Sequence, residues 1–177
     1  RTWEEAKKPV RFAEGAERSV ERVWCTVPGA ADQPGVLYAG VAPAAIFQSR
    51  DGGLHWTEIE SLSEHPSRGK WFPGAGGLMV HCICPHPTDS NKIHLGISSA
   101  GTFSTEDGGQ TWEPRNQGVR ADFLPDKYPE VGQCVHHLEL DPKKPTVLYQ
   151  QNHCGVYRSD DEGKQWTDIS KGLPSRF

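Results

Sequence analysis

The chain has 177 residues, of which 35% are hydrophobic and 24% are charged, and its formal net charge is −4. These fractions are ordinary for a globular domain that buries one core. The negative net charge argues against a nucleic-acid partner, and no apolar run reaches the roughly 20 residues that a membrane-spanning helix needs. We therefore predict neither a nucleic-acid nor a membrane partner.

Short strands are predicted along most of the chain. Apolar residues alternate with polar ones between turn signals, and no segment has a helical period of apolar residues. In chain order, the predicted strands are residues 22–27, 36–41, 45–49, 56–59, 79–84, 92–97, 101–105, 112–115, 134–140, 146–151, 155–159 and 166–169. The sequence thus predicts an all-β fold in which a set of four strands occurs three times.

One motif, Ser/Thr-x-Asp-x-Gly-x-x-Trp, recurs before the last strand of each set. Its copies are Ser49, Asp51, Gly53 and Trp56; Thr105, Asp107, Gly109 and Trp112; and Ser159, Asp161, Gly163 and Trp166. Trp3, within the opening Arg-Thr-Trp-Glu, matches the end of a fourth copy. The four tryptophans recur every 53 to 56 residues, and spacing of this length is typical of repeat proteins.

The residue types of the motif predict a turn that is held by its own side chains. An Asp carboxylate accepts bonds from nearby backbone N–H groups, and the Ser or Thr hydroxyl joins this network. The Gly supplies a positive φ, and the Trp covers the turn. A catalytic role for Asp51, Asp107 and Asp161 is the alternative, but catalysis needs one special environment and these three are equivalent. We therefore predict a structural role.

The motif resembles the Asp-box, or BNR repeat, of sialidases, sortilin-type receptors, xyloglucan-hydrolysing enzymes and photosystem assembly factors. In that family the box joins the third and fourth strands of a β-propeller blade, away from the active site. Asp141-Pro142 and Val147-Leu148-Tyr149 resemble the family's turn into the second strand. The segment 149–159 is similar to uncharacterised bacterial Asp-box proteins described as glycosyl hydrolases. The resemblance implies a propeller, and it says little about activity.

The repeat divides the chain into blades. We expect residues 1–16 to belong to a preceding blade, and blades over 17–60, 61–116 and 117–177. Propellers close with about 4–8 blades, so three predict part of a larger propeller. The missing blades would come from a longer chain or from a second copy. The start of the chain inside a motif favours the longer chain.

If the box turns lie at one end of the blades, the long loops 7–19, 60–78 and 116–132 lie at the other. Loops on a rigid scaffold commonly carry binding groups. Aromatic rings beside charged groups suit a sugar, although they equally suit packing of one loop on the next. The candidate ligand-binding residues of these loops are Arg68, Trp71, Arg120, Asp122, Asp126 and Tyr128.

Histidines concentrate in the innermost strands of the second and third sets and in one turn. His81 and His136 would line the central channel, as proton-transfer groups or as hydrogen-bonded lining, and His153 is a third candidate. Strand alternation places Cys82 and Cys84 on one face and His81 on the other, and the spacing matches no zinc pattern. We therefore predict no metal and no cofactor.

The five cysteines make an odd number without a disulfide-scaffold spacing. Buried free thiols are expected, which favours a reducing compartment such as the cytoplasm.

Two functions fit this sequence. The first is a binding or scaffold module that holds a glycan or a protein on the loop face. The alternative is a glycoside hydrolase of sialidase-like or xyloglucanase-like type, which needs two carboxylates across one site. Asp122, Asp126, Glu130 and Glu139 are candidates, but the three arginines and the Tyr and Glu pair of sialidases are not matched. No catalytic residue is assigned.

Overall fold

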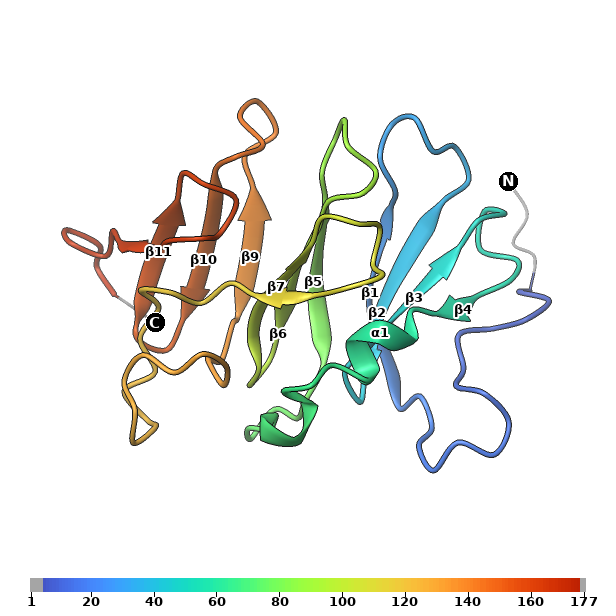
Figure 1. Ribbon diagram of the computed structural model, residues 1–177, viewed down its shortest axis with the longest axis horizontal. Coiled ribbons are helices and arrows are strands. Elements are labelled where there is room, and N and C mark those ends of the chain that lie inside the picture. The colour runs from blue at the N-terminus through green and yellow to red at the C-terminus, as the bar shows by residue number, and fades with distance from the viewer. Residues whose placement is uncertain (1–4, 176–177) are drawn as a thin grey trace.

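The computed structural model describes residues 5–175, and these form three antiparallel sheets of four strands each. Blade 1 contains β1 (Arg22–Pro28), β2 (Leu37–Ala42), β3 (Ala45–Ser49) and β4 (Thr57–Glu58); blade 2 contains β5 (Val80–Pro85), β6 (Ile93–Ile97), β7 (Gly101–Thr105) and β8 (Glu113–Pro114); blade 3 contains β9 (His137–Leu140), β10 (Leu148–Asn152), β11 (Gly155–Ser159) and β12 (Thr167–Asp168). Each sheet pairs its strands in sequence order. The three blades lie side by side in chain order, with blade 2 between blades 1 and 3 (Figure 1).

The predicted all-β fold with three four-stranded blades is therefore confirmed. Two short helices, α1 (Glu60–Ser63) and the 3₁₀ helix η1 (Arg68–Lys70), interrupt the loop between blades 1 and 2, where the sequence has no helical period. The fourth strands are only two residues long, shorter than predicted. None of the helices in the described part of the chain is long and apolar enough to cross a membrane.

The recurring motif forms the same turn in all three blades, between the third and fourth strands. In blade 1 the Ser49 hydroxyl donates to Asp51 Oδ1 at 2.9 Å and accepts the Gly53 N–H at 2.9 Å. Asp51 Oδ1 also accepts the His55 N–H at 3.0 Å. The corresponding three bonds measure 2.7, 2.9 and 2.9 Å in blade 2 and 2.7, 2.8 and 2.9 Å in blade 3. Asp51, Asp107 and Asp161 therefore have equivalent surroundings.

These bonds make the Asp107 turn sensitive to acid. The Thr111 hydroxyl and then the Thr111 N–H lower the pKa of Asp107 from 3.8 to about 2. The charged form is favoured by folding, so this stabilisation is complete above the unfolded pKa of 3.8 and is lost as the pH falls toward about 2.

We expect the melting temperature to fall between about pH 4 and pH 2, and Asp107→Asn to flatten that fall. An Asn oxygen still accepts the Thr111 N–H, so the turn persists without a titrating group. Thermal melts at stepwise pH measure the slope. Asp32→Asn, at an exposed site outside the turn, is the control and should keep the wild-type slope. Equal slopes in the wild type and Asp107→Asn would contradict the argument.

Each box tryptophan is attached to the segment that leaves the preceding blade. The Trp166 ring N–H donates to the Arg115 carbonyl at 2.8 Å, and the Trp166 backbone N–H donates to the Gln117 carbonyl at 2.9 Å. In blade 1 the Trp56 backbone N–H donates to the Lys8 carbonyl at 3.2 Å. Lys8 follows Trp3 by five residues, as Gln117 follows Trp112. Lys8 thus bonds to the blade 1 tryptophan as Gln117 bonds to Trp166, and the predicted assignment of residues 1–16 to a preceding blade stays a prediction. Trp3 itself lies outside the described residues.

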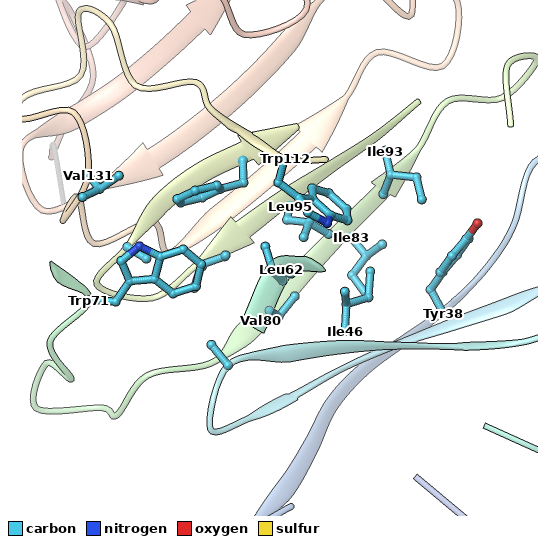
Figure 2. Packing of buried hydrophobic residues seen from close by; sticks show 14 residues of the cluster. Tyr38, Ile46, Leu62, Trp71, Val80, Ile83, Ile93, Leu95, Trp112 and Val131 are labelled. Carbon is cyan, nitrogen blue, oxygen red and sulfur yellow. The ribbon is translucent and has the colours of Figure 1, made fainter. Parts of the chain in front are cut away.

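The main core lies between blades 1 and 2 rather than within either one. Figure 2 shows Tyr38 and Ile46 of blade 1 with Val80 and Ile83 of blade 2, and Leu62 of α1 among them. All five are buried. A second cluster joins blade 2 to blade 3, and its members are Cys82, Val119, Val135, Leu138, Leu140, Leu148, Tyr157 and Trp166. Blade-to-blade packing therefore holds the fold together.

Glycine allows the closest of these contacts. Gly40 lies in β2, and a Cβ at this position would overlap the Val80 carbonyl oxygen of blade 2 and lie 3.0 Å from Cys25 Sγ. Gly96 has the same register in β6, where a Cβ would lie 3.1 Å from Cys82 Cβ and from Val135. At Gly40 the backbones of blades 1 and 2 approach each other because no side chain intervenes, and at Gly96 the side chain of Val135 packs directly against the backbone of β6.

Candidate functional site

The candidate site lies at the end of the blades opposite the box turns, which we call the loop end. It comprises residues 64–79, residues 117–136 and the turn 153–154. Figure 1 shows the long loops at the bottom and the turns between the first and second strands at the top. This separation follows from the antiparallel order of the strands, as predicted.

Arg120 and Asp122 form an ion pair at the loop end of blade 3. Arg120 Nη2 and Nε donate to the two oxygens of Asp122 at 2.5 and 3.2 Å. Asp122, followed by Tyr157 and Tyr128, raises the pKa of Arg120. The pair is partly exposed, with 31% and 41% of the two side chains accessible. The N–H donors of Arg120 and the carboxylate oxygens of Asp122 can therefore also hydrogen-bond to a ligand.

Buried groups of the next turn hold this loop in place. Asn152 is fully buried, and its Nδ2 donates to the Arg120 carbonyl at 2.9 Å. Its Oδ1 accepts the N–H groups of Cys154 and Gly155 at 2.7 and 3.1 Å. The Asp122 N–H in turn donates to Cys154 Sγ at 3.3 Å. The loop and the turn that carries His153 form one hydrogen-bonded unit.

Two exposed aromatic rings belong to the same loop as the ion pair. Phe123 is 52% exposed and contacts the edge of the His153 ring, with 5.7 Å between centroids. Tyr128 is 58% exposed, and its N–H donates to Asp126 Oδ1 at 2.9 Å. Phe123 was not among the predicted site residues, because a sequence does not distinguish an exposed aromatic ring in a loop from a packed one.

Trp71 is a correction to the predicted site. It is only 5% exposed, its ring packs on Phe103 at 4.8 Å and on His65 at 6.0 Å, and its ring N–H donates to Ser67 Oγ at 2.9 Å. Arg68 lies over the same ring at 4.8 Å, and burial lowers the pKa of Arg68. Trp71 is therefore a core residue of this loop, covered by Arg68, and it presents no free face to a ligand.

The candidate histidines divide into two groups. His81 Nε2 hydrogen-bonds to the Val135 carbonyl at 2.8 Å, and burial lowers the pKa of His81. It has the contacts of a hydrogen-bonded lining residue. His136 lies instead against His153, with 3.1 Å between their Nε2 atoms, and burial followed by His153 lowers the pKa of His136. Cys134 completes a cluster in which the three ligand atoms lie within 4.8 Å of one another.

The candidate carboxylates each contact a different group. Asp122 pairs with Arg120, Asp126 accepts a backbone N–H, Glu130 pairs with Lys70 at 3.7 Å, and Glu139 pairs with His137 at 3.2 Å. Among the described residues, no hydrogen bond or ion pair joins two of these four carboxylates. The four carboxylates thus have four different partners.

All five cysteines are free thiols, and three of them lie between neighbouring innermost strands. Burial raises the pKa of Cys25 to about 11 and also raises that of Cys84. Cys84 donates to the Leu138 carbonyl at 3.4 Å, and Cys82 accepts the Leu138 N–H at 3.4 Å. These thiols are protonated packing groups of the innermost strands.

No known family model matches the chain, and no curated protein matches it. Among solved structures, an ancestral GH74 enzyme is similar with a TM-score of 0.58 and 15% identity, over 85% of this chain and 18% of that one. A GH74 enzyme of Niastella koreensis is similar with a TM-score of 0.54 and 19% identity, over 87% of this chain and 23% of that one. YCF48 bound to a D1 peptide matches with a TM-score of 0.48 and 17% identity, over 84% and 42%.

The chain thus spans about a fifth of the length of the two GH74 enzymes, at 18% and 23%. At identities of 15% and 19%, this likeness shows the fold alone. Together with the three sheets described above, it places the chain as three blades of a β-propeller.

Proposed function

We propose that the protein is a propeller module that binds a glycan at the loop end of blade 3. The observation that carries the proposal is the pairing of two exposed aromatic rings, Phe123 and Tyr128, with the charged pair of Arg120 and Asp122. Aromatic faces pack against the C–H faces of sugar rings, and a guanidinium–carboxylate pair donates to and accepts from hydroxyl groups.

The rigidity of the loop supports this proposal. The buried Asn152 holds the Arg120 carbonyl, and Cys154 holds the Asp122 N–H, so both charged residues start from fixed backbone positions. A loop that is already ordered loses less conformational entropy when a ligand binds, and more of the contact energy remains as affinity.

Binding without catalysis is the reading that the contacts favour. Asp122 is neutralised by Arg120, and the Asp126 carboxylate closes the local turn to Tyr128. A glycosidase needs two carboxylates at a set separation, one of them a proton donor. The proposal therefore assigns neither Asp122 nor Asp126 as that proton donor.

A glycan array followed by calorimetry on the strongest hit tests the proposal. We expect binding of an oligosaccharide without turnover, and at least about a tenfold loss of affinity in both Phe123→Ala and Tyr128→Ala, because each removes a stacking face. Lys144→Ala, whose exposed ion pair with Asp160 lies at the opposite end, should bind like the wild type. If the protein releases product from the bound oligosaccharide or from aryl glycosides, the protein is a glycoside hydrolase and the proposal of binding without turnover is wrong. Equal affinities in all four proteins would overturn the site.

A further inference from the structure

We propose that Cys134, His136 and His153 bind a zinc ion at the loop end of blade 3. The three side chains come from two segments that pair in the sheet. Cys134 and His136 are two residues apart in the extended segment before β9, so both point to the same side of it. The His136 N–H donates to the Gln151 carbonyl at the end of β10 at 2.8 Å. His153 lies in the adjoining turn, on the same side of this pairing.

The geometry is close to that of a filled site. The two Nε2 atoms are 3.1 Å apart, and the rings meet edge-on at 86° with centroids 4.2 Å apart. Zn–N bonds of about 2.0–2.1 Å in a tetrahedron place two nitrogens about 3.3 Å apart. One ligand atom from each of the three side chains lies within 4.8 Å of the other two, and a filled site has sulfur and nitrogen about 3.6 Å apart. Zinc binding therefore requires the Cys134 side chain to move toward the two imidazoles.

The chemistry of the donor set selects the ion. One thiolate and two imidazoles are the ligands that Zn²⁺ prefers, whereas Mg²⁺ and Ca²⁺ require oxygen. Binding converts the Cys134 thiol to a thiolate and releases its proton to solvent. Three protein ligands leave the fourth tetrahedral position for water or for a group of a bound ligand.

The exposure of His153 lets an ion reach the cluster from solvent. The contacts of His81 keep this further histidine out of the ligand set. His153 is exposed, while Cys134 and His136 are partly buried. His81, in the innermost strand of blade 2, has its Nε2 at the Val135 carbonyl and its Nδ1 3.2 Å from Cys82 Sγ. Its two nitrogens are therefore engaged elsewhere. The ring of Phe123, in contact with His153, walls one side of the site.

Strand alternation applied to residues 134–136 alone places Cys134 and His136 on one face. The sequence named His153 as a candidate but did not place it beside them, because the whole of β9 and β10 lies between. The fold supplies it by bringing the turn after β10 beside the segment before β9. The site therefore depends on tertiary structure and has no short-motif signature.

Titration of chelator-treated protein with Co²⁺, a spectroscopic substitute for Zn²⁺, tests the proposal. We expect one equivalent to bind, with a thiolate-to-cobalt charge-transfer band in the near ultraviolet and visible bands of four-coordinate intensity, and Zn²⁺ to displace it. Cys134→Ser should abolish the charge-transfer band. His153→Ala, at an exposed site that does not threaten folding, should weaken zinc binding in calorimetry by at least about tenfold.

His137→Ala is the matched control. His137 is next to His136 in the chain, but its side chain is 67% exposed and pairs with Glu139 at 3.2 Å. Its replacement should leave the cobalt spectrum and the zinc affinity unchanged. A spectrum without the charge-transfer band, or equal zinc affinity in the wild type and in His153→Ala, would reduce the cluster to a hydrogen bond between two imidazoles and overturn the proposal. No glycan enters this assay, so its outcome is independent of the proposed glycan site.

Discussion

Replacing Trp166 by alanine is expected to lower the free energy of unfolding by about 3–5 kcal/mol. Trp166 is 2% exposed and packs in the cluster that joins blades 2 and 3. Its ring N–H also donates to the Arg115 carbonyl of blade 2 at 2.8 Å. Alanine would leave a cavity in the contact between the blades and a carbonyl without its donor. Urea unfolding monitored by circular dichroism measures the change.

Two further variants show whether the loss comes from the buried position of Trp166 or from the removal of any tryptophan. Trp166→Phe keeps most of the volume but loses the bond to Arg115, so we expect a smaller loss, about half that of alanine. Trp24→Ala removes a tryptophan that is 43% exposed in β1, and we expect it to change stability by less than about 1 kcal/mol. If Trp166→Ala cost no more than Trp24→Ala, the contact between blades 2 and 3 would contribute little to stability.

Replacing Gly40 by alanine is expected to destabilise the protein by at least about 2 kcal/mol, although it adds a single methyl group. A Cβ there overlaps the backbone oxygen of Val80, which cannot rotate away as the end of a side chain can. Blades 1 and 2 would have to separate to admit it. The penalty would appear in the same urea unfolding experiment.

Gly69→Ala is the matched control for this prediction. Gly69 lies in η1, where a Cβ would meet nothing within 4 Å, and like Gly40 it does not have a positive φ. We expect a change within about 0.5 kcal/mol, with a small gain allowed by the reduced freedom of the unfolded chain. Equal effects at the two glycines would show that the blades can shift at no cost.

The fold was predictable because the sequence repeats the same turn and strand signals three times, so each copy supports the interpretation of the others. Asp51, Asp107 and Asp161 each specify the same turn, and each is followed by a tryptophan at the same offset. The one-turn helix α1 and the helix η1 were not predicted, because a segment this short has no measurable period. Their positions follow from tertiary packing of Leu62 and Trp71 between blades 1 and 2.

The site was less predictable, because burial and convergence are properties of the folded chain. Trp71 and Tyr128 are both aromatic residues in long loops, yet one is 5% exposed and the other 58%. Their sequence contexts give no basis for that difference. Likewise, His153 meets His136 only after β9 and β10 have paired. The loop end could be located from the sequence, whereas the contacts within it could not.

The bonds from Trp56 to Lys8 and from Trp166 to Gln117 have a consequence for how the molecule can be divided. Gln117 lies after the last strand of blade 2 and before the first strand of blade 3, and Lys8 lies before the first strand of blade 1. A blade excised at the limits of its own strands would lack the backbone segment to which its box tryptophan hydrogen-bonds. Stable pieces should therefore be cut a few residues beyond a box tryptophan, and neighbouring blades should gain and lose structure together.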